Sequence, residues 1–300
     1  MCPFFFIFAV IRFNMIVIIG ADGFLGGSMA AKLRDAEARH TISGIELVQF
    51  TDTDEFFQFL PLHYREVEWV IYCDKRIPNA ALSVFRFEFV QKLWTVAARY
   101  SVPLLYAFHQ SMEQPESDFN SDRFVVWSGR QYRRPPFWYI FKVGEIYGPK
   151  EDVDREQTSR IFSFYQQIVT TGKATILQTE QDKGNAGTTR DYLYVQDAVR
   201  VFYWFMQHRP ANGVYDLGSG FERTDLAVVN AIFRTLKLSP QIQYPLSQPF
   251  FPDGSSVIFK PDLSNLRRVG YKKPFFSVEN GIKSSLRRLS GAEKPVVSRC

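Results

Sequence analysis

The sequence predicts an α/β protein in which helices cover both faces of a doubly wound parallel sheet. Three observations lead to this expectation: the β-branched apolar run Met15–Ile19, a glycine-rich turn directly after it, and further short apolar runs that alternate with segments of helical period. Such alternation is typical of parallel sheets, because parallel neighbours need a long crossover between them. A chain of 300 residues is long enough for one large α/β domain and a smaller lobe.

The first half of the chain alternates regularly between the two patterns. A helix is expected from the glycine turn to about Arg39. Further strands are expected at 45–50, 67–72 and 102–108, and helices at 54–60 and 80–100. The following segment, 112–136, is polar and interrupted by prolines, so the pattern assigns it to neither class.

The second half is expected to begin with a strand at 137–146 that leads into Tyr147-Gly148-Pro149. Asp197 is expected to cap the helix at 197–208. Helices are expected at 158–171, 197–208, 226–236, 263–269 and 277–289, and one further strand is expected at 257–260.

Three glycines, Gly20, Gly23 and Gly26, lie between the first strand and the first helix. In this pattern the first glycine permits a tight turn, the second lets the backbone approach a pyrophosphate, and the third allows close helix–strand packing. The free N–H groups of the helix then bind the phosphates. The predicted Rossmann-type site for NAD or NADP consists of Gly20, Asp22, Gly23, Phe24, Leu25 and Gly26. The alternative is a tight turn that no longer binds a phosphate.

An acidic residue after the second strand would bind the adenosine ribose of such a cofactor. Asp52 follows the strand expected at 45–50 and is the candidate. Its carboxylate would equally well cap the helix expected at 54–60. The pattern therefore leaves both roles open, and with them the choice between NAD and NADP.

These features divide the chain into four parts. An apolar N-terminal extension, 1–14, is too short to cross a bilayer, and Met15 is an alternative start. The dinucleotide-binding Rossmann domain spans 15–150, and the region 151–290 completes the sheet and forms a small C-terminal substrate lobe. Residues 291–300 form a tail.

Charge and cysteine usage argue against several classes of function. The formal charge of +5 is spread out and accompanies no nucleic-acid motif. Its densest clusters are Arg130, Arg133 and Arg134, and then Arg267, Arg268, Arg287 and Arg288. We expect these to be solvated faces, with binding of a polyanion or nucleotide phosphate as the alternative. Three cysteines (Cys2, Cys73, Cys300) are too scattered for a disulfide framework or metal site, so a reducing, cytoplasmic compartment is expected.

Four features occur in a fixed order: the glycine turn, Lys142–Pro149, Arg190–Asp197 and Tyr215–Gly220. They resemble the GxxGxxG, R-x-x-N-V-Y-G-P, R-D-F-V-Y-V-x-D and F-N-L-G-T-G motifs of the extended short-chain dehydrogenases/reductases, the NAD-dependent epimerase/dehydratase family. The segment 262–275 is similar to the C-terminal part of the heptose 6-epimerase branch. The resemblance extends over roughly 15–289 and implies a nucleotide-sugar ligand.

By this resemblance, Arg190 lies near the diphosphate of the nucleotide-sugar, which its fixed fork of donors would suit. Tyr147 belongs to the loop leading into the substrate lobe, where the nicotinamide would lie. The family's acid–base pair is a tyrosine four residues before a lysine on one helix face. None of the fourteen tyrosines has a lysine at that spacing, and the segment that should carry the pair, 112–118, contains neither residue type.

The position of the family's catalytic serine or threonine falls on His109, after the strand expected at 102–108. Arg155 is the nearest match to the basic residue that assists catalysis in the heptose epimerases. A histidine can act as a base near neutral pH, so His109 is a candidate substitute, and a hydrogen-bonded structural role is the alternative.

Three hypotheses follow. The first is a catalytically degenerate, heptose-epimerase-like protein that retains dinucleotide or nucleotide-sugar binding. The second is an active nucleotide-sugar epimerase with relocated acid and base groups, and the third is a structural subunit or interaction protein with an empty cofactor site. The complete glycine turn and Arg190 favour the first over the third, and the missing pair favours it over the second. A homo-oligomer or protein complex is compatible with the chain, but the family's usual dimer interface would include the shortened helix.

Overall fold

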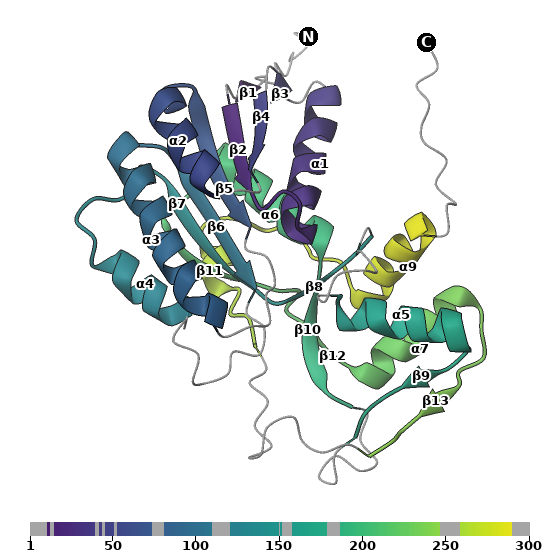
Figure 1. Cartoon of the computed structure of the whole chain (residues 1–300). Helices are drawn as coiled ribbons and strands as arrows, with labels where there is room; N and C mark the ends of the chain where they lie inside the picture. The colour runs from purple at the N-terminus through teal and green to yellow at the C-terminus, as the bar shows by residue number, and fades with distance from the viewer. Residues whose placement is uncertain are drawn as a thin grey trace, which may run out of the picture.

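The computed structural model describes residues 11–12, 15–39, 42–43, 46–50, 53–73, 81–109, 121–149, 151, 158–178, 187–246 and 259–289. The chain forms a larger part around a central sheet and a smaller lobe that contains α5 (Arg160–Thr171), α7 (Asp225–Leu236) and α9 (Val278–Leu289) (Figure 1). Of the N-terminal extension only β1 (Ile11–Arg12) is described, and it pairs in parallel with β3 (Ile42–Ser43).

The central sheet has six parallel strands in the order β11-β7-β6-β5-β2-β4. The chain passes from β2 to β4 and then returns to β5 on the opposite side of β2, so the strand order reverses there. This arrangement confirms the expected doubly wound α/β fold. The strands are β2 (Met15–Ile19), β4 (Glu46–Phe50), β5 (Val67–Cys73), β6 (Leu104–His109), β7 (Trp138–Val143) and β11 (Gly213–Leu217).

Helices cover both faces of this sheet (Figure 1). α1 (Phe24–Ala38) and α6 (Val195–His208) pack with one face, where Ile16 and Ile18 of β2 lie. α2 (Thr53–His63), α3 (Ala81–Tyr100) and α4 (Ser121–Gly129) pack with the other, which receives the remaining β2 side chains. Because both faces are covered, all five residues of β2 are buried, which explains why the strand is a continuous apolar run.

The smaller lobe is continuous with the larger part through a three-stranded sheet, ordered β12-β10-β8. β8 (Glu145–Tyr147) begins one residue after β7, and α6 begins directly after β10 (Thr189–Tyr194). β12 (Glu222–Thr224) pairs antiparallel with β10. α5, α7 and α9 pack with this sheet around a separate apolar core. The parallel pair β9 (Ala174–Thr175) and β13 (Ile242–Gln243) also belongs to the lobe, and α8 (Ser264–Arg268) precedes α9.

Several boundaries differ from those expected. The helix expected at 54–60 extends over 53–63 and includes Pro61. The unassigned segment contains α4, which packs through Phe124 against the ring of Trp94 in α3. The single strand expected at 137–146 is two strands, because the chain leaves the central sheet at Gly144, whose N–H donates to Leu217 O (2.9 Å).

The strand expected at 257–260 is wrong for Phe259 and Lys260, which are described and are not in a strand, while 257–258 lie outside the described residues. Within the described ranges, no helix combines the length and apolar character that a membrane span requires. The same residues hold no group of three or more histidine, cysteine or acidic side chains suited to a metal ion.

Candidate functional site

The turn between β2 and α1 is shaped by close backbone contacts. Gly20 has a φ of 81° and donates its N–H to Phe50 O (3.2 Å), while Gly23 donates to Gly20 O (3.0 Å). A Cβ added at Gly20 would overlap the carbonyl oxygen of Cys73, and one at Gly26 would overlap that of Gly20. These two glycines are therefore required by the packing of the turn itself, which the sequence pattern anticipated.

The start of α1 has the features of an anion site. Gly23 is the N-cap residue, its backbone is extended, and no side chain caps the first turn. The first turn also contains no acidic residue. Helix N-termini leave N–H groups unsatisfied and carry partial positive charge, so they bind phosphates readily. The residues of this turn therefore fit the pyrophosphate of a dinucleotide, which they would hold through backbone N–H groups.

The other predicted cofactor residues occupy different surroundings. Asp22 is exposed, Phe24 is partly buried, and Leu25 is buried in the core under α1. Phe24 and Leu25 thus contribute packing, and only their backbone is suited to a phosphate. Asp52 lies outside the described residues, so the role predicted for it stays a prediction.

Tyr147, predicted to lie near the substrate, is buried inside the lobe. Its hydroxyl donates to Val278 O of α9 (3.3 Å), and a Cβ at Gly281 would overlap that hydroxyl. Burial raises the pKa of Tyr147 well above its ordinary value, with the nearby Asp197 carboxylate adding to the effect. These contacts favour a structural role that attaches α9 to β8.

Arg190 lies within β10 as its second residue, rather than before the strand as the motif suggested. It is directly opposite Arg223 of β12, so both side chains project from the same face of the sheet. Arg223 donates to Glu279 (3.2 Å), whereas the buried Nε of Arg190 has no acceptor in the described part of the chain. Two neighbouring guanidiniums, one with an unsatisfied donor, form a local environment suited to an oxyanion.

A buried carboxylate that the sequence analysis did not single out, that of Asp191, lies beside Arg190. Asp191 accepts hydrogen bonds from the N–H groups of Ser219 (2.6 Å) and Gly220 (2.7 Å), which follow β11. Burial raises its pKa, and these N–H donors oppose the rise. Asp191 therefore joins the lobe strand β10 to the end of the central strand β11.

Glu151 is another buried acid and lies two residues after Pro149. Its carboxylate accepts from Gly148 N (2.9 Å), Ser159 N (2.7 Å) and Ser159 Oγ (2.9 Å). Burial raises the pKa of Glu151 to about 7, although these hydrogen bonds oppose the rise. In the sequence, Glu151 is marked only by its position just after Tyr147-Gly148-Pro149, and this position does not predict its hydrogen-bond partners.

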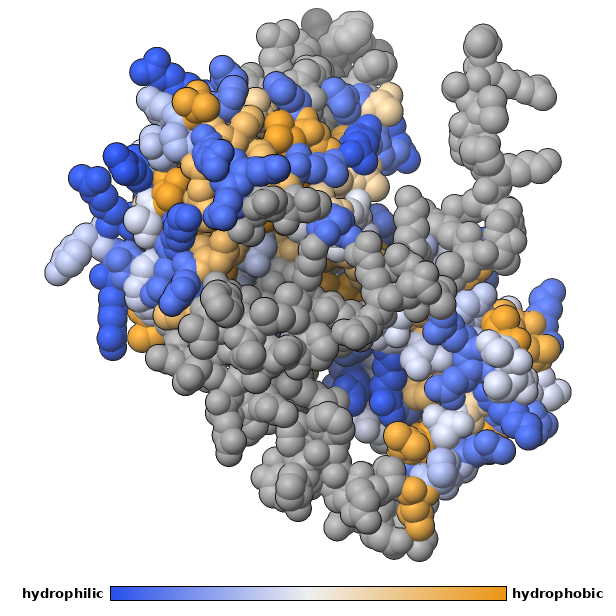
Figure 2. Space-filling view, in the orientation of Figure 1, coloured by the Kyte–Doolittle hydropathy of each residue, from blue (hydrophilic) through white to orange (hydrophobic). Residues whose placement is uncertain are grey.

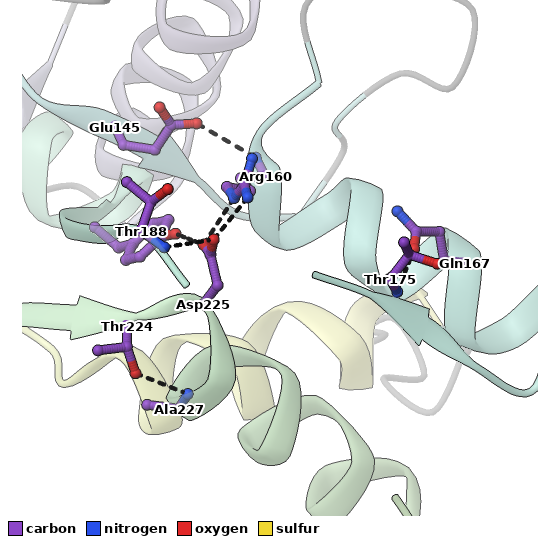
Figure 3. A network of polar contacts seen from close by, with 9 residues as sticks. Glu145, Arg160, Gln167, Thr175, Thr188, Thr224, Asp225 and Ala227 are labelled. Atoms are coloured by element: carbon purple, nitrogen blue, oxygen red, sulfur yellow. Dashed lines mark hydrogen bonds and ion pairs between the residues drawn. The ribbon is translucent and has the colours of Figure 1, made fainter. Parts of the chain in front are cut away.

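The starts of α5 and α7 meet at an ion pair in the lobe (Figure 3). Arg160 donates through Nε (2.7 Å) and Nη2 (2.6 Å) to the two oxygens of Asp225, which is fully buried. The same carboxylate accepts from Thr188 N (3.1 Å) and from the Tyr192 hydroxyl (3.3 Å). Glu145 of β8 accepts from the backbone N–H of Arg160 (3.3 Å), so four elements meet at this cluster.

Asp197 does not cap α6, contrary to expectation. The N-cap residue is Tyr194, which makes no side-chain capping bond, and Asp197 lies in the first helical turn. Its buried carboxylate pairs with Arg200 and accepts from Phe276 N (2.7 Å). Asp197 therefore holds the segment before α9 against α6, because the backbone of that segment supplies its partner.

Comparison with known proteins shows which family this chain resembles. The model of the NAD dependent epimerase/dehydratase family matches residues 119–218, which include β7, β8, β10 and β11. The ADP-L-glycero-D-manno-heptose-6-epimerase of Nitratidesulfovibrio vulgaris (strain Hildenborough) is 30% identical over 179 residues, which are 59% of this chain and 55% of that protein. The enzyme of the same name from Pseudomonas paraeruginosa is 22% identical and is matched over 92% of this chain and 98% of its own.

The chain therefore resembles the NAD-dependent epimerase/dehydratase family, the extended short-chain dehydrogenases/reductases, and residues 119–218 match the model of that family. It spans about half the length of the Nitratidesulfovibrio relative.

Solved structures of epimerases share the fold of this chain. The ADP-L-glycero-D-manno-heptose-6-epimerase of Helicobacter pylori superimposes with a TM-score of 0.69 and 16% identity, covering 92% of this chain and 96% of that one. The UDP-glucose 4-epimerase of Thermus thermophilus, solved in complex with NAD, gives a TM-score of 0.67 and 18% identity, covering 93% and 100%.

The position expected to carry this family's acid–base pair, 112–118, lies outside the described residues, as does Arg155. His109 is described and is the last residue of β6, in register with Val143 of β7. Its ring lies at the carboxyl end of a central strand, the end at which open parallel sheets bind ligands. The structure thus places His109 at the functional edge of the sheet, and its catalytic role stays a prediction.

Proposed function

We propose that this protein is a heptose-epimerase-like member of its family that binds a dinucleotide at the turn before α1 and a nucleotide-sugar near Arg190, and that it has lost the family's acid–base catalysis. The observation that carries the proposal is the combination of an uncapped α1 N-terminus on an intact glycine turn with a sequence that lacks the tyrosine–lysine pair. When bound, NAD or NADP would supply a hydride acceptor. The chain's own residues would hold its phosphates and the ligand diphosphate.

The ionisation of the described tyrosines supports the loss of catalysis. A tyrosine that removes a proton from a sugar hydroxyl at neutral pH needs a lowered pKa. Burial instead raises the pKa of five described tyrosines: Tyr139, Tyr147, Tyr192, Tyr215 and Tyr271. These hydroxyls therefore stay protonated and are unsuited to act as the base.

Calorimetric titration with NAD and NADP tests the binding part of the proposal. We expect the wild-type protein to bind one of them, and Gly23→Val to lose binding at least tenfold, because a side chain at the helix N-cap would occupy the space that the pyrophosphate needs. Gly129→Val is the matched control, since a Cβ at Gly129 meets no atom within 4 Å. Equal affinity in the wild type and Gly23→Val would show that the turn is not the site.

An active epimerase with relocated groups is the second candidate, and the position of His109 at the end of β6 is the observation that favours it. Turnover of ADP-heptose substrates by the wild-type protein would support it, and His109→Ala should then lower kcat by about 100-fold or more, as expected when a general base is removed. His63→Ala is the control, because His63 lies on the exposed end of α2. No turnover in the wild type, together with cofactor binding, supports the degenerate protein, and no cofactor binding supports the interaction protein.

A further inference from the structure

The ends of α3 and α4 form a pocket that is separate from the turn before α1. Its volume is about 410 Å³, within the range of small-molecule sites. The lining residues are Trp94, Thr95, Ala98, Arg99, Gln131 and Arg133. Hydrophilic side chains gather on the side of the molecule where α3 and α4 lie (Figure 2). The pocket therefore combines an apolar surface, from Trp94 and Ala98, with two guanidiniums.

The two arginines of this pocket have no acceptor in the described part of the chain. Neither Arg99 nor Arg133 donates a hydrogen bond or forms an ion pair there, and Arg99 only approaches the ring of its neighbour Tyr100 (5.7 Å). Trp94 is 1% exposed, and its indole Nε1–H is likewise buried without an acceptor. A buried donor without an acceptor is uncommon in folded proteins, and the two exposed guanidiniums have no partner in the described residues that would compete with an anionic ligand.

The helix ends do not account for these arginines. Arginines are common at helix C-termini, because they compensate the partial negative charge and the free carbonyls there. Here Arg134 already donates to Gly129 O (2.7 Å) and Gln131 O (3.1 Å) at the end of α4. At the end of α3, Val102 N donates to Ala97 O (2.9 Å).

The balance of charge leads to the same conclusion. Two helix C-termini contribute together about −1 elementary charge. Arg99, Arg130, Arg133 and Arg134 bring one positive charge each, so a clear positive excess is left around the pocket. The loop that carries most of this charge is also fixed in place, because Gln131 Nε2 donates to Trp127 O (3.1 Å). A pair of guanidiniums suits phosphate oxygens better than a single charge does.

We propose that the pocket between α3 and α4 binds a small phosphate-bearing anion through Arg99 and Arg133. The binding is of moderate strength and sensitive to salt, because both arginines are exposed and mobile ions screen them. This site is independent of the proposed cofactor and nucleotide-sugar sites. On this proposal the arginine cluster at 130–134 binds an anion, which was the alternative to a solvated face.

Titration of the full-length protein with pyrophosphate at low ionic strength, followed by calorimetry, tests the proposal. We expect Arg99→Gln/Arg133→Gln to weaken binding at least tenfold, since both phosphate contacts are removed. Lys272→Gln/Lys273→Gln is the control, because it removes the same charge from two exposed lysines after α8 and should leave the affinity unchanged. The same titration in Gly23→Val, which removes the proposed dinucleotide site, should retain binding.

Three results would overturn the assignment. Unchanged affinity in the double arginine variant would show that these side chains do not hold the anion. An equal loss in the lysine control would show that only net charge matters. Loss of all pyrophosphate binding in Gly23→Val would place the anion at α1 instead, without deciding against the proposed function.

Discussion

Glu151 joins the two ends of the segment 152–157, because its carboxylate accepts from Gly148 on one side and from Ser159 on the other. Its burial makes the charged form costly, so the carboxylate holds these donors while carrying a pKa near neutrality. A pKa raised from 4.5 to about 7 corresponds to about 3 kcal/mol of differential free energy between protonated and ionised forms. A single side chain thereby links the connection between β8 and α5 to pH.

The direction in which pH changes the free energy of unfolding through Glu151 can be measured. The folded state holds the Glu151 proton more tightly than the unfolded state, so the contribution to stability is complete below about pH 4.5 and is lost as the pH rises through about 7. Urea unfolding at several pH values should show that the wild type loses stability over this window relative to Glu151→Gln, which has no such proton. The two proteins should keep a constant difference above pH 8.

Glu279 supplies the contrasting control. Its pKa is lowered, with Arg223 as the charged partner among the groups that favour ionisation. Its contribution is therefore present above the unfolded pKa and lost as the pH falls, so Glu279→Gln should not reproduce the Glu151 profile. A wild-type protein and a Glu151→Gln variant with parallel pH profiles between 4.5 and 7 would contradict the assignment.

At the scale of elements, the lobe depends on a junction where α5, α7, β8 and β10 meet (Figure 3). Asp225 is the first residue of α7, and Thr224 caps that helix by accepting from Ala227 N (3.2 Å). The capping bond and the ion pair therefore act on the same helix end. Because Asp225 is fully buried and bound by four donors, its carboxylate is satisfied only when all these elements are in place.

Removing one partner of this junction should cost more than removing both. Asp225→Ala leaves the Arg160 guanidinium and the Tyr192 hydroxyl without their acceptor, and we expect the free energy of unfolding to fall by about 3 kcal/mol. Asp225→Ala/Arg160→Met should recover part of this loss, because no uncompensated charge stays in the lobe. Denaturant unfolding measures both values.

Asp262→Ala is the control for that pair of variants, since Asp262 is exposed and its carboxylate accepts hydrogen bonds only from Ser264 among the described residues. We expect it to leave the unfolding midpoint unchanged. A single Asp225→Ala variant as stable as the wild type would mean that the junction does not hold the elements together.

At the scale of the whole molecule, the sequence predicted the sheet better than the lobe. An inner strand such as β2 is a continuous apolar run because both faces of the sheet are covered, and such a run is visible in the chain itself at Met15–Ile19. The glycine turn was predictable for a similar reason, since only glycine fits where Gly20 and Gly26 touch neighbouring backbone.

The lobe was less predictable because its elements are short and its contacts link distant residues. β9, β12 and β13 have two or three residues each, too few to show a period. Asp191 accepts from a residue 28 positions away and Asp225 from one 65 positions away, so nothing local identifies these contacts. Asp197 has a local partner in Arg200 and a distant one in Phe276. The capping role expected for Asp197 was wrong because the helix begins two residues earlier, so Asp197 lies inside the first turn.

The central sheet is completed late in the chain. α6, which covers the face where Ile16 and Ile18 lie, begins at Val195, and the edge strand β11 ends at Leu217. During synthesis, α1 follows β2 directly and can cover part of this face, but α6 emerges only after five of the six strands, so the rest of the apolar face stays exposed in the interval. We therefore expect the nascent chain to be prone to aggregation until α6 has been made.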